Sequence, residues 1–186
     1  RRIPQMLNQW RIGNRAISAW EPEIVPIGDM RDSVLALIGF GRIARAVATR
    51  AQAFGMRCLA YAPTVSEWEV RSYGVRQVPL DEAFGAADVV SVHLPLTPGT
   101  HHFVSTDLLA LMKSSAVLIN VARGELVDED ALVQAVEGGQ IRGAVLDVYR
   151  GELEGQPPRR ELVELPHILL SPHISARGAD LREERK

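Results

Sequence analysis

The chain has 186 residues, a formal net charge of −2 and a single cysteine, a length typical of one ordinary domain with an appendage. Hydrophobic residues make up 46% and charged residues 24%, which excludes a disordered or fibrous chain, and the balanced charge gives no basic footprint for nucleic acid. No apolar run reaches the roughly 18 residues of a membrane-spanning helix, and the lone Cys58 cannot form an internal disulfide. We therefore expect a cytoplasmic globular protein without a membrane partner, a nucleic-acid partner or a metal site.

The first half of the chain predicts an arm followed by alternating strands and helices. Residues 1–30 mix tryptophans, prolines and charges with a short helical rhythm, which indicates an N-terminal helix and a connecting arm. From Val34 onward, apolar runs predict buried strands over 34–38, 57–61, 75–78 and 88–93. Helical spacing predicts helices over 42–54 and 80–87.

The second half continues the alternation. Ser105 is expected to cap a helix that runs to Met112, and Asp128 to cap one that ends at Gly138 and Gly139. Further strands are predicted over 116–120, 143–148 and 167–171, and the polar segment 151–161 is predicted as a loop. Strands alternating with helices predict an α/β fold, a doubly wound parallel sheet of the Rossmann type.

A glycine pattern lies where the first strand meets the first long helix. The sequence Gly39-Phe40-Gly41-Arg42-Ile43-Ala44 follows strand 34–38 directly. Glycines there permit a tight turn and the close approach of a pyrophosphate, whose charge meets free backbone amides and the positive end of the helix. The position favours dinucleotide binding; the alternative is a glycine turn in an α/β protein that binds no ligand.

The residue after the second strand leaves the choice of cofactor open. An acidic side chain at that point would hydrogen-bond the adenosine ribose of NAD, but Ala62 stands there, and no carboxylate follows before Glu67. Without a carboxylate, nothing repels the 2′-phosphate of NADP, yet no arginine follows immediately to bind it. The sequence therefore predicts NAD or NADP without deciding between them.

Three polar residues follow three of the predicted strands. Arg123 comes after strand 116–120, Glu152 after strand 143–148 and His173 after strand 167–171. Because ligands of open parallel sheets bind at the carboxyl ends of the strands, these side chains can converge on one site. Taken singly, each residue could instead be structural: Arg123 part of a surface turn, Glu152 a solvated charge in a loop and His173 a histidine in a turn.

Several motifs together resemble one family. The segments Ile119–Asp128, Leu146–Tyr149 and Ser171–Ile174, with Gly39–Ala44 and His93–Pro98, look like the cofactor-binding domain of the D-isomer-specific 2-hydroxyacid dehydrogenases. The resemblance covers about residues 1–176. It implies that residues 1–30 are an arm used for dimer contact, 31–176 the NAD(P)-binding domain and 177–186 a truncated tail, with the substrate lobe of the family largely absent.

The resemblance also implies a role for each site residue. Arg123 matches the arginine that grips the substrate carboxylate and carbonyl, His173 the general acid and base, and Glu152 the carboxylate that hydrogen-bonds the histidine. The implied cofactor residues are Gly39, Gly41, Arg42, Ile43, Ala62, Leu94, Pro95, Thr100, Val121, Ala122 and Asp147. After His173, the sequence Ile174-Ser175-Ala176 replaces residues that usually include glycine, so the backbone beside the nicotinamide is expected to differ.

The expected function is hydride transfer between NAD(P)H and the carbonyl of a small 2-oxo acid, or the reverse with the 2-hydroxy acid, by a homodimer. Two alternatives remain. One is a catalytically silent dinucleotide-binding module, because the chain is too short to supply the second lobe of the family. The other is a related formate or phosphite dehydrogenase, which shares much of this domain.

Overall fold

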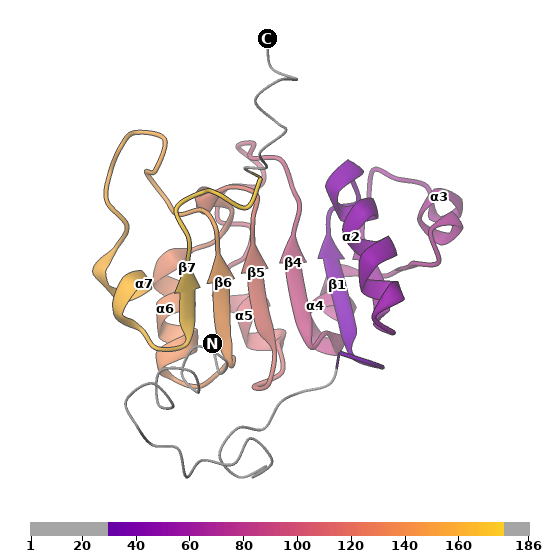
Figure 1. The fold of residues 1–186 in the computed structure, drawn as a ribbon, viewed down its shortest axis with the longest axis horizontal. Helices are drawn as coiled ribbons and strands as arrows, with labels where there is room; N and C mark the ends of the chain where they lie inside the picture. The colour runs from indigo at the N-terminus through magenta and orange to yellow at the C-terminus, as the bar shows by residue number, and fades with distance from the viewer. Residues whose placement is uncertain (1–29, 177–186) are drawn as a thin grey trace, which may run out of the picture. The chain divides into compact units, whose positions relative to one another are not determined.

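The computed structural model describes residues 30–176 and arranges seven strands in one parallel sheet (Figure 1). The order across the sheet is β3-β2-β1-β4-β5-β6-β7. In chain order the strands are β1 (Val34–Ile38), β2 (Arg57–Tyr61), β3 (Arg76–Gln77), β4 (Val89–Val92), β5 (Val117–Asn120), β6 (Gly143–Leu146) and β7 (Ile168–Leu170). The chain runs from β1 to one edge, returns beside β1 and then runs to the other edge, which confirms the doubly wound sheet.

Helices cover both faces of this sheet. They are α2 (Arg42–Ala53), α3 (Glu67–Ser72), α4 (Leu80–Ala86), α5 (Thr106–Leu111), α6 (Glu129–Glu137) and α7 (Arg160–Glu164), with a 3₁₀ turn η1 (Gly124–Leu126). Alternate residues of β1 point to opposite faces of the sheet. Leu35 and Leu37 pack in the hydrophobic cluster that contains Ala48 of α2, whereas Ala36 packs in the cluster that contains Phe84 of α4. Burial on both sides explains why the strands are continuously apolar.

The carboxyl ends of the strands lie at one edge of the sheet, where the arrowheads of β1, β4, β5, β6 and β7 point in Figure 1. Register places Ile38 beside Val92, Val92 beside Asn120 and Asn120 beside Leu146. The loops that follow β1, β4, β5 and β6 therefore start side by side, although up to about a hundred residues of chain separate them. This edge holds the residues discussed below.

Two capping predictions had different outcomes. Asp128 caps α6 as predicted, since its carboxylate accepts hydrogen bonds from the N–H groups of Asp130 (3.0 Å) and Ala131 (3.1 Å). Ser105 occupies the N-cap position of α5, but its hydroxyl makes no capping hydrogen bond. Ser105 therefore occupies the predicted position, but its side chain does not cap the helix.

The sequence did not predict two short helices. Helix α3 has six residues and α7 has five, and each buries a single side chain, Val70 and Leu162 respectively. One buried residue produces no repeat that a periodicity argument can detect. Helix α7 begins at Arg160, so it overlaps the end of the segment predicted as a loop.

Other predictions lie outside the described residues or concern absences. The predicted arm, 1–30, lies outside the described residues except for Met30, and the predicted tail, 177–186, lies wholly outside them. Between residues 30 and 176, no helix has the length and apolar character needed to cross a lipid bilayer. In the same range, no cluster of three or more His, Cys, Asp or Glu side chains is placed to hold a metal ion.

Candidate active site

The glycine loop joins β1 to α2 in a tight turn. Gly39 has φ +95°, and a Cβ there would lie 2.8 Å from the carbonyl oxygen of His93, so both backbone conformation and space require glycine. Helix α2 begins at Arg42 with no capping side chain and no acidic residue in its first turn. Open space adjoins Gly41, where no atom lies within 4 Å of a Cβ position. Exposed amides at the positive end of a twelve-residue helix fit the pyrophosphate of a dinucleotide.

A cleft of about 570 Å³ opens beside this loop. Three loops line it, those that follow β1, β4 and β5, and the lining residues are Gly41, Arg42, Ile43, Ala44, His93, Leu94, Pro95, Leu96, Val121, Ala122 and Arg123. Most of the predicted cofactor residues are therefore brought together in one hollow. The four that do not line it are Gly39, Ala62, Thr100 and Asp147.

Two of these four residues, Thr100 and Ala62, take part in local hydrogen bonds. Thr100 donates its hydroxyl to the carbonyl of Pro95 (2.7 Å) and accepts the N–H of Thr97 (2.8 Å), so it fixes the turn that carries Pro95. Ala62 follows β2 and is only 2% exposed. Its carbonyl accepts a hydrogen bond from the side-chain amide of Gln77 (2.8 Å), which the sequence reasoning did not single out.

His93 forms part of the cleft wall at the end of β4. Its Nε2 lies 2.9 Å from the hydroxyl of Ser91, and burial lowers its pKa to about 4. A histidine with this pKa is neutral at pH 7. His93 therefore adds a polar but uncharged imidazole to the cleft.

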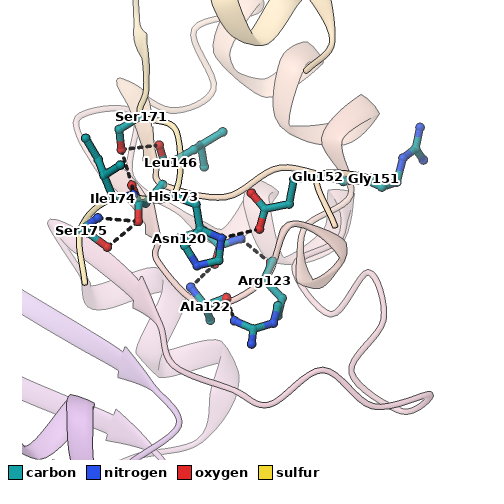
Figure 2. Close-up of polar contacts among 12 residues, drawn as sticks. Asn120, Ala122, Arg123, Leu146, Gly151, Glu152, Ser171, His173, Ile174 and Ser175 are labelled. Carbon is teal, nitrogen blue, oxygen red and sulfur yellow. Dashed lines mark hydrogen bonds and ion pairs between the residues drawn. The ribbon is translucent and has the colours of Figure 1, made fainter. Parts of the chain in front are cut away.

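His173 and Glu152 meet at the carboxyl edge of the sheet (Figure 2). Nδ1 of His173 lies 2.8 Å from Oε1 of Glu152, whose side chain is 7% exposed. The contact lacks the angle of a hydrogen bond, and this buried oxygen has no hydrogen-bond partner among residues 30–176. Nε2 of His173 makes no hydrogen bond in the described part of the chain.

The backbone of His173 has the left-handed value φ +50°, which is unfavourable for a residue other than glycine. Asp147 holds it there. The carbonyl of Asp147 accepts the N–H of His173 (2.9 Å), while its carboxylate accepts the hydroxyl of Ser171 (2.6 Å), the N–H of Ile174 (3.0 Å) and both the N–H (3.0 Å) and the hydroxyl of Ser175.

These bonds determine the charge of Asp147, which is 3% exposed. Burial raises the pKa of its carboxyl, but the hydrogen bonds from Ser171, Ser175 and Ile174 outweigh burial and lower the pKa to about 2. Four donors occupy the roughly four acceptor positions of one carboxylate. The resemblance implies that Asp147 contacts the nicotinamide. In this structure its carboxylate is instead hydrogen-bonded to the loop that carries His173.

Arg123 follows β5 and is exposed. Buried Asn120 holds the turn that carries it, since its amide donates to the carbonyl of Arg123 (2.7 Å) and its oxygen accepts the N–H of Ala122 (3.1 Å). The guanidinium donates to the carbonyl of Ala122 (2.6 Å) and, in Figure 2, points away from His173 and Glu152.

The sequence reasoning did not single out Asn120 and the two serines as site residues. An asparagine at the end of a strand is a known signal for a local turn, so the role of Asn120 could have been inferred. Ser171 and Ser175 could not have been assigned, because their partner Asp147 lies 24 and 28 residues away in the sequence.

Comparison with known proteins identifies the family. A family model described as the NAD binding domain of D-isomer specific 2-hydroxyacid dehydrogenases matches residues 1–175. The chain belongs to the D-isomer-specific 2-hydroxyacid dehydrogenase family. This confirms the resemblance inferred from the glycine loop and the three strand-end motifs.

Individual proteins of known sequence or structure are similar to this chain. D-3-phosphoglycerate dehydrogenase of Sus scrofa is 39% identical over 184 residues, which are 98% of this chain and 32% of that protein. An acyclic imino acid reductase solved with NADPH and D-Arg is 31% identical with a TM-score of 0.85, covering 99% of this chain and 56% of that one. The NAD complex of a D-isomer specific 2-hydroxyacid dehydrogenase from Lactobacillus delbrueckii ssp. bulgaricus is 32% identical with a TM-score of 0.76, covering 89% and 54%.

The chain thus spans between a third and about half the length of these relatives. Their dinucleotides are NADPH in one structure and NAD in the other, which agrees with a cofactor prediction that names both. The glycine loop and cleft of this dehydrogenase domain fit such a group. The roles of individual residues remain predictions.

Replacing Asp147 with Asn should remove a pH-dependent part of the stability. A carboxyl whose pKa is lowered on folding stabilises the folded state above its unfolded pKa and loses this effect as the pH falls toward the folded value. From an ordinary value near 3.8 and a folded value of about 2, the contribution at neutral pH is about 2 kcal/mol. The Asp147→Asn variant should be less stable than the wild type at about pH 6, and this difference should shrink by about 1 kcal/mol at about pH 3.

Urea denaturation at the two pH values measures this difference. Glu154→Gln is the control, because its exposed side chain, in the turn after β6, makes no recorded hydrogen bond or ion pair among residues 30–176. A difference between the wild type and Asp147→Asn that stays constant with pH would contradict the assignment of the lowered pKa to Asp147.

Proposed function

We propose that this chain is the cofactor-binding and acid–base part of an oxidoreductase that transfers a hydride between NAD(P)H and a small 2-oxo acid. The observation that carries the proposal is the contact between His173 and Glu152 at the sheet edge that also holds the glycine loop and its cleft. An acid–base pair beside a dinucleotide site supports hydride transfer coupled to proton transfer.

The dinucleotide would be held mainly by backbone groups. The amides at the start of α2 would face the pyrophosphate, and the wall formed by Val121 and Ala122 would position the nicotinamide. When bound, the reduced nicotinamide supplies the hydride. The chain's own contribution is to orient this group and to exclude water from the cleft.

Arg123, His173 and Glu152 would act on the substrate. Arg123 would bind the carboxylate of the 2-oxo acid, for which its planar fork is suited. His173 would donate the proton on Nε2 to the carbonyl oxygen while the carbonyl carbon gains the hydride, giving the 2-hydroxy acid. Glu152 would hold the opposite ring nitrogen. In the reverse direction, His173 would remove the hydroxyl proton.

The decisive variant is His173→Gln. General acid–base catalysis contributes roughly 10² to 10⁴ in rate, so we expect kcat to fall by about that factor with unchanged affinity for NAD(P)H. Oxidation of NADH and NADPH would be followed by absorbance with glyoxylate, hydroxypyruvate and pyruvate, in the longest natural chain that carries this sequence. Calorimetry on the 186-residue chain would measure cofactor binding.

Exposed His101→Gln, in the loop after β4, is the matched control and should keep full activity. Cofactor binding without turnover of any 2-oxo acid by the wild type would favour the silent binding module instead. Turnover of formate or phosphite alone would favour the third alternative.

Cofactor preference should respond to a charge at Ala62, which follows β2 where the relevant ribose contact is expected. Ala62→Asp is predicted to weaken NADPH binding at least tenfold relative to NADH, since a carboxylate repels a 2′-phosphate and can accept a ribose hydroxyl. Because Ala62 is buried, Ala62→Asn serves as the control for size. If both variants give the same ratio of NADPH to NADH dissociation constants, charge at this position does not set the preference.

We also propose a cytoplasmic homodimer, on the strength of the resemblance of residues 1–30 to the dimer arm of the family. Sedimentation velocity of the chain, with and without residues 1–30, checks this proposal. We expect about twice the monomer mass of 20.5 kDa for the whole chain and a monomer after removal of the arm. A monomer in both cases would contradict it.

A further inference from the structure

The turn that carries Glu152 is held by two carboxylates from the segment after Arg123. Glu129, at the start of α6, accepts the backbone N–H of Arg150 at 2.7 Å. Glu125, in η1, accepts the N–H of Gly151 at 3.2 Å. No backbone carbonyl accepts either N–H group within residues 30–176. The two carboxylates therefore supply the acceptors that a regular strand or helix would otherwise provide.

The same two segments touch through their backbones. A Cβ on Gly124 would lie 2.0 Å from the carbonyl carbon of Tyr149 and 2.4 Å from the backbone nitrogen of Arg150. Only glycine allows this approach, because the obstructing atoms are backbone rather than movable side chains. The residue next to Arg123 thus packs directly on the turn that leads to Glu152.

We propose that Glu129 is a positioning residue that fixes the turn from Arg150 to Glu152 and so keeps the carboxylate of Glu152 at Nδ1 of His173. Glu125 assists it one residue nearer to Glu152. This inference rests on the proposed function, in which Glu152 orients the catalytic histidine. Glu129 itself contacts neither His173 nor Glu152 in any hydrogen bond or ion pair recorded for the described residues.

The surroundings of Glu129 support a specific role. The residue is 4% exposed. Burial raises the pKa of its carboxyl and outweighs the hydrogen bond from Arg150, which lowers it. A buried carboxyl is costly to desolvate, and an apolar residue would fill the position with less penalty. The hydrogen bond to Arg150 is the feature that an apolar side chain could not supply.

The test compares Glu129→Met, which removes the acceptor, with Glu129→Gln, which keeps an acceptor oxygen. The ring ¹⁵N resonances of His173 report on its contact with Glu152. In Glu129→Met, we expect these resonances to move toward their values in Glu152→Gln, and in Glu129→Gln to stay near the wild type. Exposed Glu137, at the end of the same helix, gives the matched control Glu137→Met, which should leave them unchanged.

Kinetics of the longest natural chain provide the second measurement. Glu129→Met should lower kcat by about 10- to 100-fold, a loss typical of a small misplacement of catalytic groups, with little change in KM for the dinucleotide. Glu129→Gln should restore most of the rate. In the background Glu152→Gln, the replacement of Glu129 by Met should have no further effect on kcat, because both act through the same contact.

The outcomes separate the two proposals. Wild-type resonances in Glu129→Met, or full additivity with Glu152→Gln, would overturn the positioning role. Absence of turnover in the wild type would defeat the proposed function, whereas the resonances of His173 would still report on the turn. If Glu129→Met does not fold, Glu125→Met decides the question. A shift of the His173 resonances toward their values in Glu152→Gln supports the proposal, and unchanged resonances contradict it.

Discussion

The part of the candidate site around His173 depends on the hydrogen bonds that the carboxylate of Asp147 accepts. This carboxylate lies at the carboxyl end of β6 and collects its hydrogen bonds from Ser171, Ile174 and Ser175, which surround His173 on both sides in sequence. The loop after β7 has no regular secondary structure. The buried carboxylate adds to the two backbone hydrogen bonds, from Ser171 to Leu146 and from His173 to Asp147, that hold this loop beside the end of β6. The left-handed backbone of His173 persists because these bonds determine the path of the loop.

The two ends of the site are built by different means. The part that would bind the dinucleotide uses a glycine turn, an uncapped helix terminus and the neutral His93, where the loops after β1, β4 and β5 meet. The part around His173 and Glu152 uses buried carboxylates that accept backbone N–H groups from loops distant in sequence. Asp147 holds the loop that carries His173, and Glu129 holds the turn before Glu152. An ionised acceptor makes stronger hydrogen bonds than a neutral one, so the lowered pKa of Asp147 suits it to hold a loop that has no regular secondary structure.

This difference explains what the sequence could and could not predict. The seven strands, the long helices and the glycine loop were predictable, because apolar runs and caps such as Asp128 are local signals. The convergence at one sheet edge followed from the rule for parallel sheets. The partners of Asp147 were not predictable, because they lie 24 to 28 residues away in the chain, and α7 buries too few residues to show a repeat. Helix α3 does carry a local signal that the sequence reasoning missed, because Ser66 caps it by accepting the N–H of Glu69 at 3.3 Å. Nor does any local pattern reveal that Gly124 lies against the backbone of Tyr149.

The approach of Gly124 to Tyr149 has a physical consequence for the whole edge. The loops after β5 and β6 pack against one another, since η1 lies against the backbone before Glu152 and strands β5 and β6 pair from Val117 with Gly143 to Asn120 with Leu146. Arg123 and Glu152 thus lie on two loops that contact one another, whereas His173 lies on the loop organised by Asp147. Asp147 links these loops, because its own N–H donates to the carbonyl of Asn120 and its carbonyl accepts the N–H of His173. A sheet that brings three strand ends together supplies proximity, and this chain of backbone and carboxylate bonds supplies the orientation that the proposed acid–base chemistry would require.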